Sequence, residues 1–284
     1  MVADFHLHTS ASDGDLDPGA LVREAASRGV RELAITDHDT LAAYRWREGA
    51  VFDEARRLGV LLTVGIEMDV ALGGREVHLL GLGLDLDAPA LGAHLAAVRA
   101  ARHERARAEL ALVRERLGED ALAEEDVFVE GRDAVMRPHF IRPLVARGRF
   151  ATYQQGREWF HENARKGVVV PKPGLAEAIG MVHAAGGEAV LAHPGYYSKD
   201  GFPILEELAS LRALGLDGVE LDYPYASSSP ELFPDGDAER FVASLRAAGK
   251  ALSLRFTRGS DAHSPADLDR VYGKPPARPA KEIA

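Results

Sequence analysis

Cysteine is absent from the 284 residues of this chain. That absence excludes disulfide bonds, thiolate-bound zinc and a thiol nucleophile, so any metal must be held by nitrogen and oxygen ligands. The sequence also lacks a run of about 18 apolar residues, which excludes an ordinary membrane-spanning helix. No basic segment followed by an apolar stretch opens the chain, so no secretory signal is visible. We therefore expect a cytoplasmic protein that does not enter the membrane.

An excess of basic residues is also missing. Lys and Arg number 34 against 44 Asp and Glu, which gives a net charge of −10. A protein that coats long nucleic acid needs a basic face, so this role is not expected. A small phosphorylated substrate remains compatible, because bound metals and a few Arg residues can supply positive charge locally. Nothing in the sequence points to an obligatory protein partner.

The histidines are concentrated near the apolar runs that we expect to form strands. The segment 4–8 is a short predicted strand in which His6 and His8 point to the same face, because side chains alternate along a strand. Four more of the eleven histidines lie in or just after such runs: His38, His78, His193 and His263. The carboxyl ends of parallel strands carry the functional groups in α/β folds. The distribution therefore predicts a shared site.

Three carboxylates accompany these histidines: Asp13, Glu67 and Asp261. Together they make nine potential ligands, whereas one zinc ion needs three or four, so two or three metals are predicted. A mixture of imidazole and carboxylate suits Mn, Fe or Zn and disfavours Mg or Ca. Any one of these residues could instead cap a helix or stabilise a turn. Their joint recurrence favours metal binding.

Strands and helices are predicted to alternate over the first 80 residues, which is typical of a parallel α/β fold. One long helix is expected at 90–116, and the alternation resumes after residues 171–174, a Pro- and Gly-containing return. We predict a main domain of residues 1–98 and 173–273, a helical insertion at 99–172, and a loose tail at 274–284. The last strand of the main domain is expected at 251–254.

The motifs resemble those of a known family. They are His6-Leu7-His8 with Ser12-Asp13-Gly14, Ile35-Thr36-Asp37-His38-Asp39, Gly65-Ile66-Glu67, Val77-His78-Leu79-Leu80-Gly81, Ala192-His193-Pro194 and Gly259-Ser260-Asp261-Ala262-His263. In order and spacing they are similar to the PHP (polymerase and histidinol phosphatase) domain. The resemblance implies a distorted (β/α)7 barrel and a metal-dependent phosphoesterase.

The same resemblance implies how the metals would be held. Glu67 would bridge two of them, as a carboxylate can between cations about 3.5 Å apart, and Glu67 and Asp261 would act at the catalytic centre. The first metal would take His6, His8, Glu67 and Asp261; the second Glu67, His78 and His193; the third Asp13, His38 and His263.

Within the insertion, Arg137, His139 and Arg142 can share one side of a helix start. Guanidinium groups match phosphate geometry, although a solvated surface helix is the alternative. A PHP subfamily that includes nucleoside 3′,5′-bisphosphate phosphatases and enzymes trimming short RNA carries a similar segment. The resemblance implies removal of the 3′-phosphate from nucleoside 3′,5′-bisphosphates to give nucleoside 5′-monophosphates, and trimming of short 5′-phosphorylated oligoribonucleotides. His139 and a metal-bound water are both candidates for protonating the leaving group.

Two other functions remain open at this stage. A histidinol-phosphate phosphatase would use the same metal centre, although the long insertion favours the nucleotide-acting subfamily. A non-catalytic, metal-stabilised regulatory module is the alternative from another class, and the complete ligand set argues against it. Metal identity, base preference, the physiological substrate and the oligomeric state are not determined by the sequence.

Overall fold

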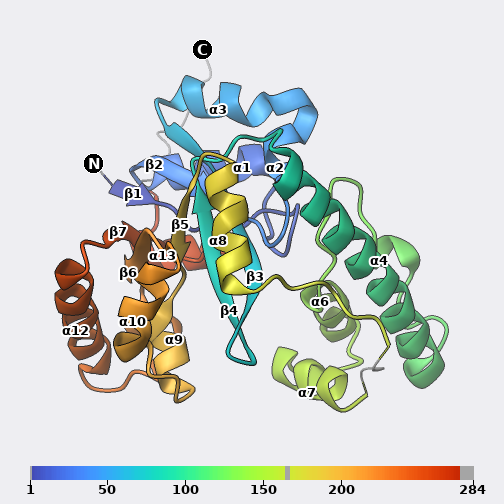
Figure 1. Ribbon diagram of the computed structural model, residues 1–284. Helices are drawn as coiled ribbons and strands as arrows, with labels where there is room; N and C mark the ends of the chain where they lie inside the picture. Colours follow the sequence, from blue (N-terminus) through green and yellow to red (C-terminus); the bar gives the residue numbers. More distant parts are fainter. Residues whose placement is uncertain (1, 164–166, 276–284) are drawn as a thin grey trace.

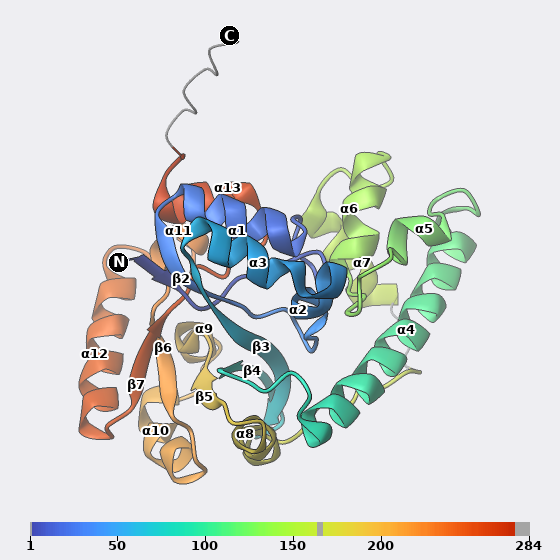
Figure 2. The same ribbon diagram turned by 90° about the horizontal axis from the view of Figure 1, so that it is seen from above.

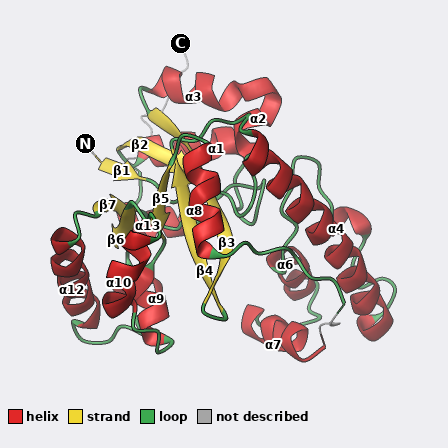
Figure 3. Ribbon diagram, viewed as in Figure 1, coloured by secondary structure: helices red, strands yellow, loops and turns green. Residues whose placement is uncertain are grey.

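The strands of the described chain follow one another in the sheet in sequence order, from β1 to β7 (Figure 1). The structure is a computed structural model that describes residues 2–163 and 167–275. The strands are β1 (Val2–Asp4), β2 (Val30–Ile35), β3 (Leu61–Leu72), β4 (Arg75–Leu82), β5 (Glu188–Leu191), β6 (Gly218–Asp222) and β7 (Arg255–Arg258). Helices surround them in Figure 3.

The segments that follow the first and last strands meet and close the sheet. Phe5 N donates a hydrogen bond to the Arg258 carbonyl oxygen (2.8 Å), and Leu7 forms a parallel bridge with Ala262. The mixed α/β architecture with this curled sheet is the barrel-like fold expected from the sequence. Because the edges close at these residues, the His6–His8 segment lies beside the segment that carries Asp261.

The expectation of a wholly parallel arrangement over the first 80 residues is wrong at β4. This strand pairs antiparallel with both β3 and β5, whereas the other neighbouring pairs are parallel. Only Gly73 and Gly74 connect β3 to β4, and both have positive φ (57° and 79°). A two-residue turn of this kind makes a hairpin and leaves no length for a crossover helix. Glu67 consequently lies inside a long strand rather than at its end.

The predicted strand at 251–254 is also wrong. Helix α12 continues to Ala251, and the strand is formed by the next four residues, Arg255–Arg258. The apolar signal misled the prediction because Leu254 packs into the core as the chain leaves the helix, with 5% of its surface exposed. The strand itself is rich in charge, and its burial is only partial.

The helices of the barrel and of the segment between β4 and β5 have the following bounds. In the first part they are α1 (Pro18–Ser27), α2 (Ala42–Arg45), the 3-10 helix η1 (Trp46–Gly49), α3 (Ala50–Leu58), α4 (Pro89–Leu117), α5 (Glu124–Val127), α6 (Pro138–Ala146) and α7 (Tyr153–Asn163). In the second part they are α8 (Leu175–Ala184), α9 (Pro194–Lys199), α10 (Ile204–Ala213), α11 (Tyr225–Ser228), α12 (Asp237–Ala251) and α13 (Pro265–Tyr272).

Helix α4 leads out of the barrel, and α5, α6 and α7 lie together beside the outer half of α4 (Figure 2). Its first turns pack on the main core through Leu91, whereas Leu110 and Val113 belong to a separate apolar cluster with Phe140 and Phe160. The insertion thus buries its own core. Its boundaries at 99 and 172 remain predictions, since α4 runs through the first without a break. The predicted tail lies, from residue 276 on, outside the described residues.

No helix in the described ranges is long and apolar enough to cross a membrane.

Candidate metal centre

The loop after β1 is organised by one buried carboxylate, Asp37. Its oxygens accept hydrogen bonds from Thr9 N (2.7 Å), from the Thr9 hydroxyl (2.6 Å) and from the Ser12 hydroxyl (2.5 Å). The loop turns tightly enough that a Cβ at Gly14 would come within 2.4 Å of the His8 carbonyl oxygen. These contacts fix Asp13 beside the His8 ring.

Glu67, 1% exposed, lies at the centre of the site. Five imidazoles surround its carboxylate. The contacts to Oε2 come from His6 Nε2, His8 Nε2 and His38 Nδ1, all at 3.3 Å, and those to Oε1 from His78 Nδ1 (2.8 Å) and His193 Nε2 (3.2 Å). The six side chains come from five separate segments, so the barrel brings together what the sequence keeps apart.

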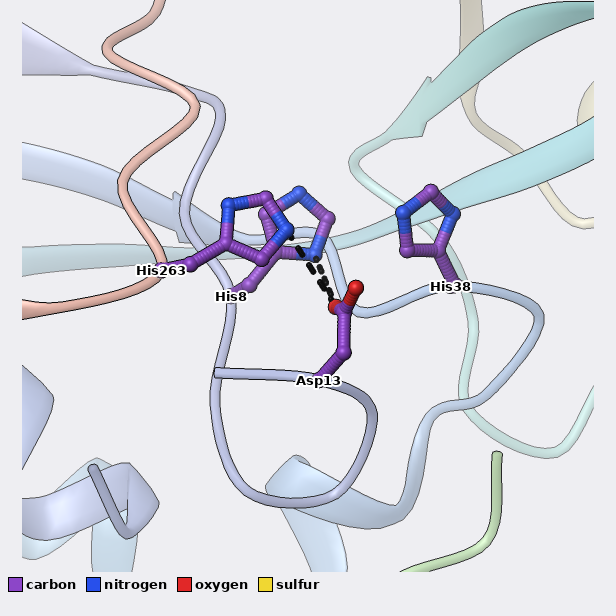
Figure 4. A group of neighbouring side chains, drawn as sticks. All are labelled: His8, Asp13, His38 and His263. Atoms are coloured by element: carbon purple, nitrogen blue, oxygen red, sulfur yellow. Dashed lines mark ion pairs between the residues drawn. The ribbon is translucent and has the colours of Figure 1, made fainter. Parts of the chain in front are cut away.

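Asp261 and Asp13 complete the cluster on either side. Asp261 Oδ1 lies 3.4 Å from His6 Nε2 and 3.1 Å from His8 Nε2. Asp13 Oδ1 lies 3.2 Å from His263 Nε2 and 3.8 Å from His8 Nδ1, the two contacts drawn in Figure 4. His38 faces the same carboxylate from the other side in that view.

The electrostatics show that these carboxylates require positive charge. Burial alone would raise the pKa of the Asp13 carboxyl, but His263 lowers it well below its ordinary value. Burial alone would lower the pKa of His263, but Asp13 raises it to about 10. Glu67 overcomes the same effect of burial at His38 and raises its pKa to about 9. In the metal-free protein, protons therefore supply part of the charge.

The donor set fits divalent metals. Among the described residues, several buried nitrogens that face carboxylates have no hydrogen-bond partner: His6 Nε2, His8 Nδ1 and Nε2, and His38 Nδ1. A polar atom buried without a partner is costly, and a metal ion would satisfy these lone pairs.

Among the described residues, four side-chain groups have the spacing of metal ligands, and three of them are made entirely of the predicted ligands. The first contains the predicted set His6, His8, Glu67 and Asp261; the second joins His38 to Glu67 and His78; the third joins His8 to the predicted Asp13, His38 and His263. His193, predicted for the second set, approaches Glu67 as described above. The structure therefore brings all nine predicted residues together, and their assignment to individual ions stays a prediction.

Glu220 was not identified from the sequence, although a charged residue inside an apolar strand is a recognisable signal. It is fully buried and accepts hydrogen bonds from His6 Nδ1 (3.0 Å) and His193 N (2.8 Å). Binding Nδ1–H in this way leaves His6 Nε2 free to face Glu67 and Asp261. A Cβ at Gly259 would come within 2.0 Å of the Glu220 carboxylate, so only glycine fits there.

We expect Glu220→Gln to lower metal affinity by about 10- to 100-fold, since carboxylates that orient ligating histidines have effects of this size. An amide cannot supply the full charge that holds the His6 ring and its tautomer. The measurement is a Mn²⁺ titration of metal-stripped protein. The matched control is Glu188→Gln, which changes a half-exposed carboxylate paired with Arg255. Equal affinities in both variants would contradict an orienting role.

The backbone is strained at three points of the site. Asp39, His193 and Asp261 have positive φ values of 49°, 29° and 53°. Such conformations cost of the order of 1–3 kcal/mol each for non-glycine residues and persist where the surrounding structure enforces them. Here they occur where the chain leaves a strand.

The insertion reaches the same site through α6. Arg142 Nη1 donates hydrogen bonds to the Asp13 carbonyl oxygen (2.9 Å) and to Asp15 Oδ1 (3.0 Å). His139 is buried, and burial together with Arg132 lowers its pKa to about 3. Arg137, in contrast, lies beside α4, with Nε 3.7 Å from Glu109 Oε1 and a side chain 43% exposed. The predicted cationic segment thus lies next to Asp13, with Arg137 displaced toward α4.

Comparison with known proteins places this geometry in a family. The model of the PHP domain matches residues 4–210. A 3′,5′-nucleoside bisphosphate phosphatase of Chromobacterium violaceum is 33% identical over 279 residues, 95% of this chain and 90% of that protein. The 5′-3′ exoribonuclease Rnm of Escherichia coli is 33% identical over 272 residues, 93% of this chain and 86% of that protein.

Solved structures of similar fold support the same family. An amidohydrolase from Chromobacterium violaceum with bound sulfate and no metal superimposes with a TM-score of 0.72 at 29% identity, over 99% of this chain and 93% of that chain. A predicted metal-dependent phosphoesterase from Bifidobacterium adolescentis gives 0.71 at 29% identity, over 98% and 91% of the two chains. With its cluster of histidines and carboxylates inside a curled α/β sheet, the chain belongs to the PHP domain family of metal-dependent phosphoesterases.

Proposed function

We propose that this phosphoesterase removes the 3′-phosphate from nucleoside 3′,5′-bisphosphates. The observation that supports this most directly is the position of α6, which places Arg142 and His139 next to the Asp13 loop of the metal centre. A substrate phosphate among the proposed metal ligands would leave a second phosphate within reach of the insertion. Arg137, whose side chain is 43% exposed and lies beside Glu109, is the candidate to bind this second phosphate.

The residues of the centre have separable roles in this proposal. The nine histidine and carboxylate ligands hold two or three ions of Mn, Fe or Zn. When bound, such ions supply charge stabilisation at phosphorus and lower the pKa of water. Glu220 holds His6 in one tautomer, and Asp37 fixes the loop of Asp13.

His139 is neutral in the free protein and carries one ring proton that it can donate. Its Nδ1 accepts a hydrogen bond from Met136 N (2.9 Å), which places the ring proton on Nε2. Nε2 is buried and has no partner in the described chain. With a pKa of about 3, His139 carries no positive charge at neutral pH. It can therefore donate to a phosphate oxygen, and it can release a proton to a leaving group only after a bound phosphate raises its pKa.

The test compares specificity constants for four substrates with Mn²⁺ present: adenosine 3′,5′-bisphosphate, short 5′-phosphorylated RNA, histidinol phosphate and p-nitrophenyl phosphate. We expect the bisphosphate to be preferred by at least about tenfold over histidinol phosphate, because histidinol phosphate has no second phosphate for the cationic segment to bind. A preference for histidinol phosphate would contradict the proposal.

Trimming of short 5′-phosphorylated RNA is the second candidate. It is favoured by the exoribonuclease of Escherichia coli, whose match covers 93% of this chain. A 5′-nucleotide of RNA presents phosphates on both sides of one ribose, as the bisphosphate does, so the same cationic segment would hold it. Release of successive 5′-monophosphates from RNA would support this function.

Arg137→Ala should lower the specificity constant for the bisphosphate by about 10- to 100-fold, since a charge-assisted hydrogen bond contributes about 1.5–3 kcal/mol. Hydrolysis of p-nitrophenyl phosphate should barely change, because that ester lacks a second phosphate. Arg147→Ala is the control: this Arg ends the same helix but pairs with Asp126. Arg142→Ala should have a similar effect, but its bonds to the Asp13 loop make it the less selective test.

Losses of equal size on both substrates would mean that Arg137 acts at the reacting phosphate or in folding. No loss on either substrate would mean that Arg137 is a solvated surface residue that does not bind the substrate.

A further inference from the structure

Arg102 on α4 makes a buried charge cluster at the border of the metal centre. Its side chain is 2% exposed. The Nη2 atom contacts the Asp39 carboxylate, and it lies 2.9 Å from Asp69 Oδ2. Asp69 N in turn donates a hydrogen bond to Asp39 Oδ1 (3.1 Å). One arginine from the insertion is thus held by two carboxylates of the barrel.

The second oxygen of Asp69 points away from Arg102. Asp69 Oδ1 is buried and, in the described chain, has no hydrogen-bond partner. It lies 3.7 Å from His78 Nε2 and 3.4 Å from His38 Nδ1, the same His38 nitrogen that faces Glu67. The other ring nitrogen of His78, Nδ1, faces Glu67 at 2.8 Å. His78 therefore presents one nitrogen to the proposed ligand cluster and the opposite nitrogen to Asp69 and to Glu76 Oε1 (3.6 Å).

A metal-ligating histidine commonly directs its second ring nitrogen toward a carboxylate that fixes its orientation, and Asp69 lies at ion-pair distance from that nitrogen of His78. We propose that Asp69 is a positioning residue for His78, and that Arg102 holds Asp69 in place. The insertion then contributes to the metal centre through α4 as well as to the substrate side through α6. The inference rests on the metal-binding role of His78.

A separate cation at Asp69, Glu76 and His78 is the competing interpretation, since their ligand atoms lie close together. Two features disfavour it. Glu76 is paired with Lys172, which already neutralises its charge. His78 would also have to bind ions through both nitrogens, which requires the loss of both ring protons.

Asp69→Asn tests the proposal with little change in shape. An amide offers one acceptor oxygen, which can face Arg102 or His78 but cannot serve both as the two carboxylate oxygens do. In a Mn²⁺ titration of stripped protein, we expect at least one equivalent to bind about tenfold or more weakly than in the wild type. The difference in melting temperature between metal-loaded and metal-stripped protein should shrink as well, because weaker binding stabilises less.

Arg102→Lys is the second variant, and it keeps the charge while losing the forked geometry. It should weaken metal binding by a smaller factor than Asp69→Asn does. It also provides the test of the proposal if Asp69→Asn does not fold. The matched control is Arg28→Lys, which alters an equally buried arginine held by Glu24 and Asp269.

A purely structural role would lower the melting temperatures of loaded and stripped protein in parallel and leave the titration unchanged. That result in Asp69→Asn or Arg102→Lys would overturn the inference. A wild-type protein that binds no metal would instead overturn the metal-binding role itself, so the two failures are distinguishable.

Discussion

Glu67→Gln should reduce the hydrolysis of every phosphoester substrate by about a thousandfold. Its carboxylate faces five histidines, with two nitrogens on one oxygen and three on the other, so under the proposed assignment it would be shared by two cations. A metal contributes several kcal/mol of transition-state stabilisation, and about 4 kcal/mol corresponds to three orders of magnitude in rate. An amide keeps the size of the side chain but lacks the charge that two cations share.

The measurement pairs turnover with metal content per chain. Glu54→Gln is the control, because Glu54 is a surface carboxylate bound by Arg23 and Arg57. Loss of activity should accompany loss of at least one metal equivalent. Wild-type turnover with an unchanged metal count would show that Glu67 is not a ligand.

Removal of metal should lower the melting temperature by about 10 °C without unfolding the protein. One ion present at a thousand times its dissociation constant stabilises a fold by about 4 kcal/mol, and each kcal/mol corresponds to about 2–4 °C in a protein of this size. The metal-free fold should persist because protons can partly replace the ions. The pKa values of His38 and His78 are about 9, with Glu67 offsetting the effect of burial in each case.

Thermal unfolding after chelation and dialysis, then after stepwise return of Mn²⁺, provides the measurement. The melting temperature should rise as metal is added and level off at two or three equivalents. Glu67→Gln protein should show a smaller rise, which ties the effect to this site. A melting temperature independent of metal would contradict the assignment of the cluster as a metal centre.

The nine side chains that meet at the site could be named from the sequence, because residue type determines which side chains are able to bind a metal. His6-Leu7-His8 places two donors two residues apart, and an extended chain directs both to one side. Asp261-Ala262-His263 has the same spacing, but Asp261 has a positive φ of 53° and its backbone is not extended. The other predicted ligands were identified from the family motifs. The same motifs implied the barrel-like fold.

Errors in the elements arose where local pattern and packing disagree. Strand β4 was expected to be parallel because strands and helices are predicted to alternate over the first 80 residues, whereas the strand direction depends on the turn at Gly73-Gly74. The final strand was placed on Leu252 and Leu254, although these apolar residues follow a helix into the core and the charged segment Arg255–Arg258 pairs with β6. Hydrophobicity reports burial, and it does not report which segment makes the hydrogen bonds of a sheet.

The sequence by itself determined which atoms are available to bind metal, since histidine and carboxylate side chains are the only strong ligands in a chain without cysteine. Only the tertiary structure decided which residues orient those ligands. Glu220 lies 214 residues from His6, and Arg102 lies 33 residues from Asp69. The physical reason is that a hydrogen bond between side chains depends on distance in space, which closure of the barrel and docking of α4 set and which no local pattern encodes.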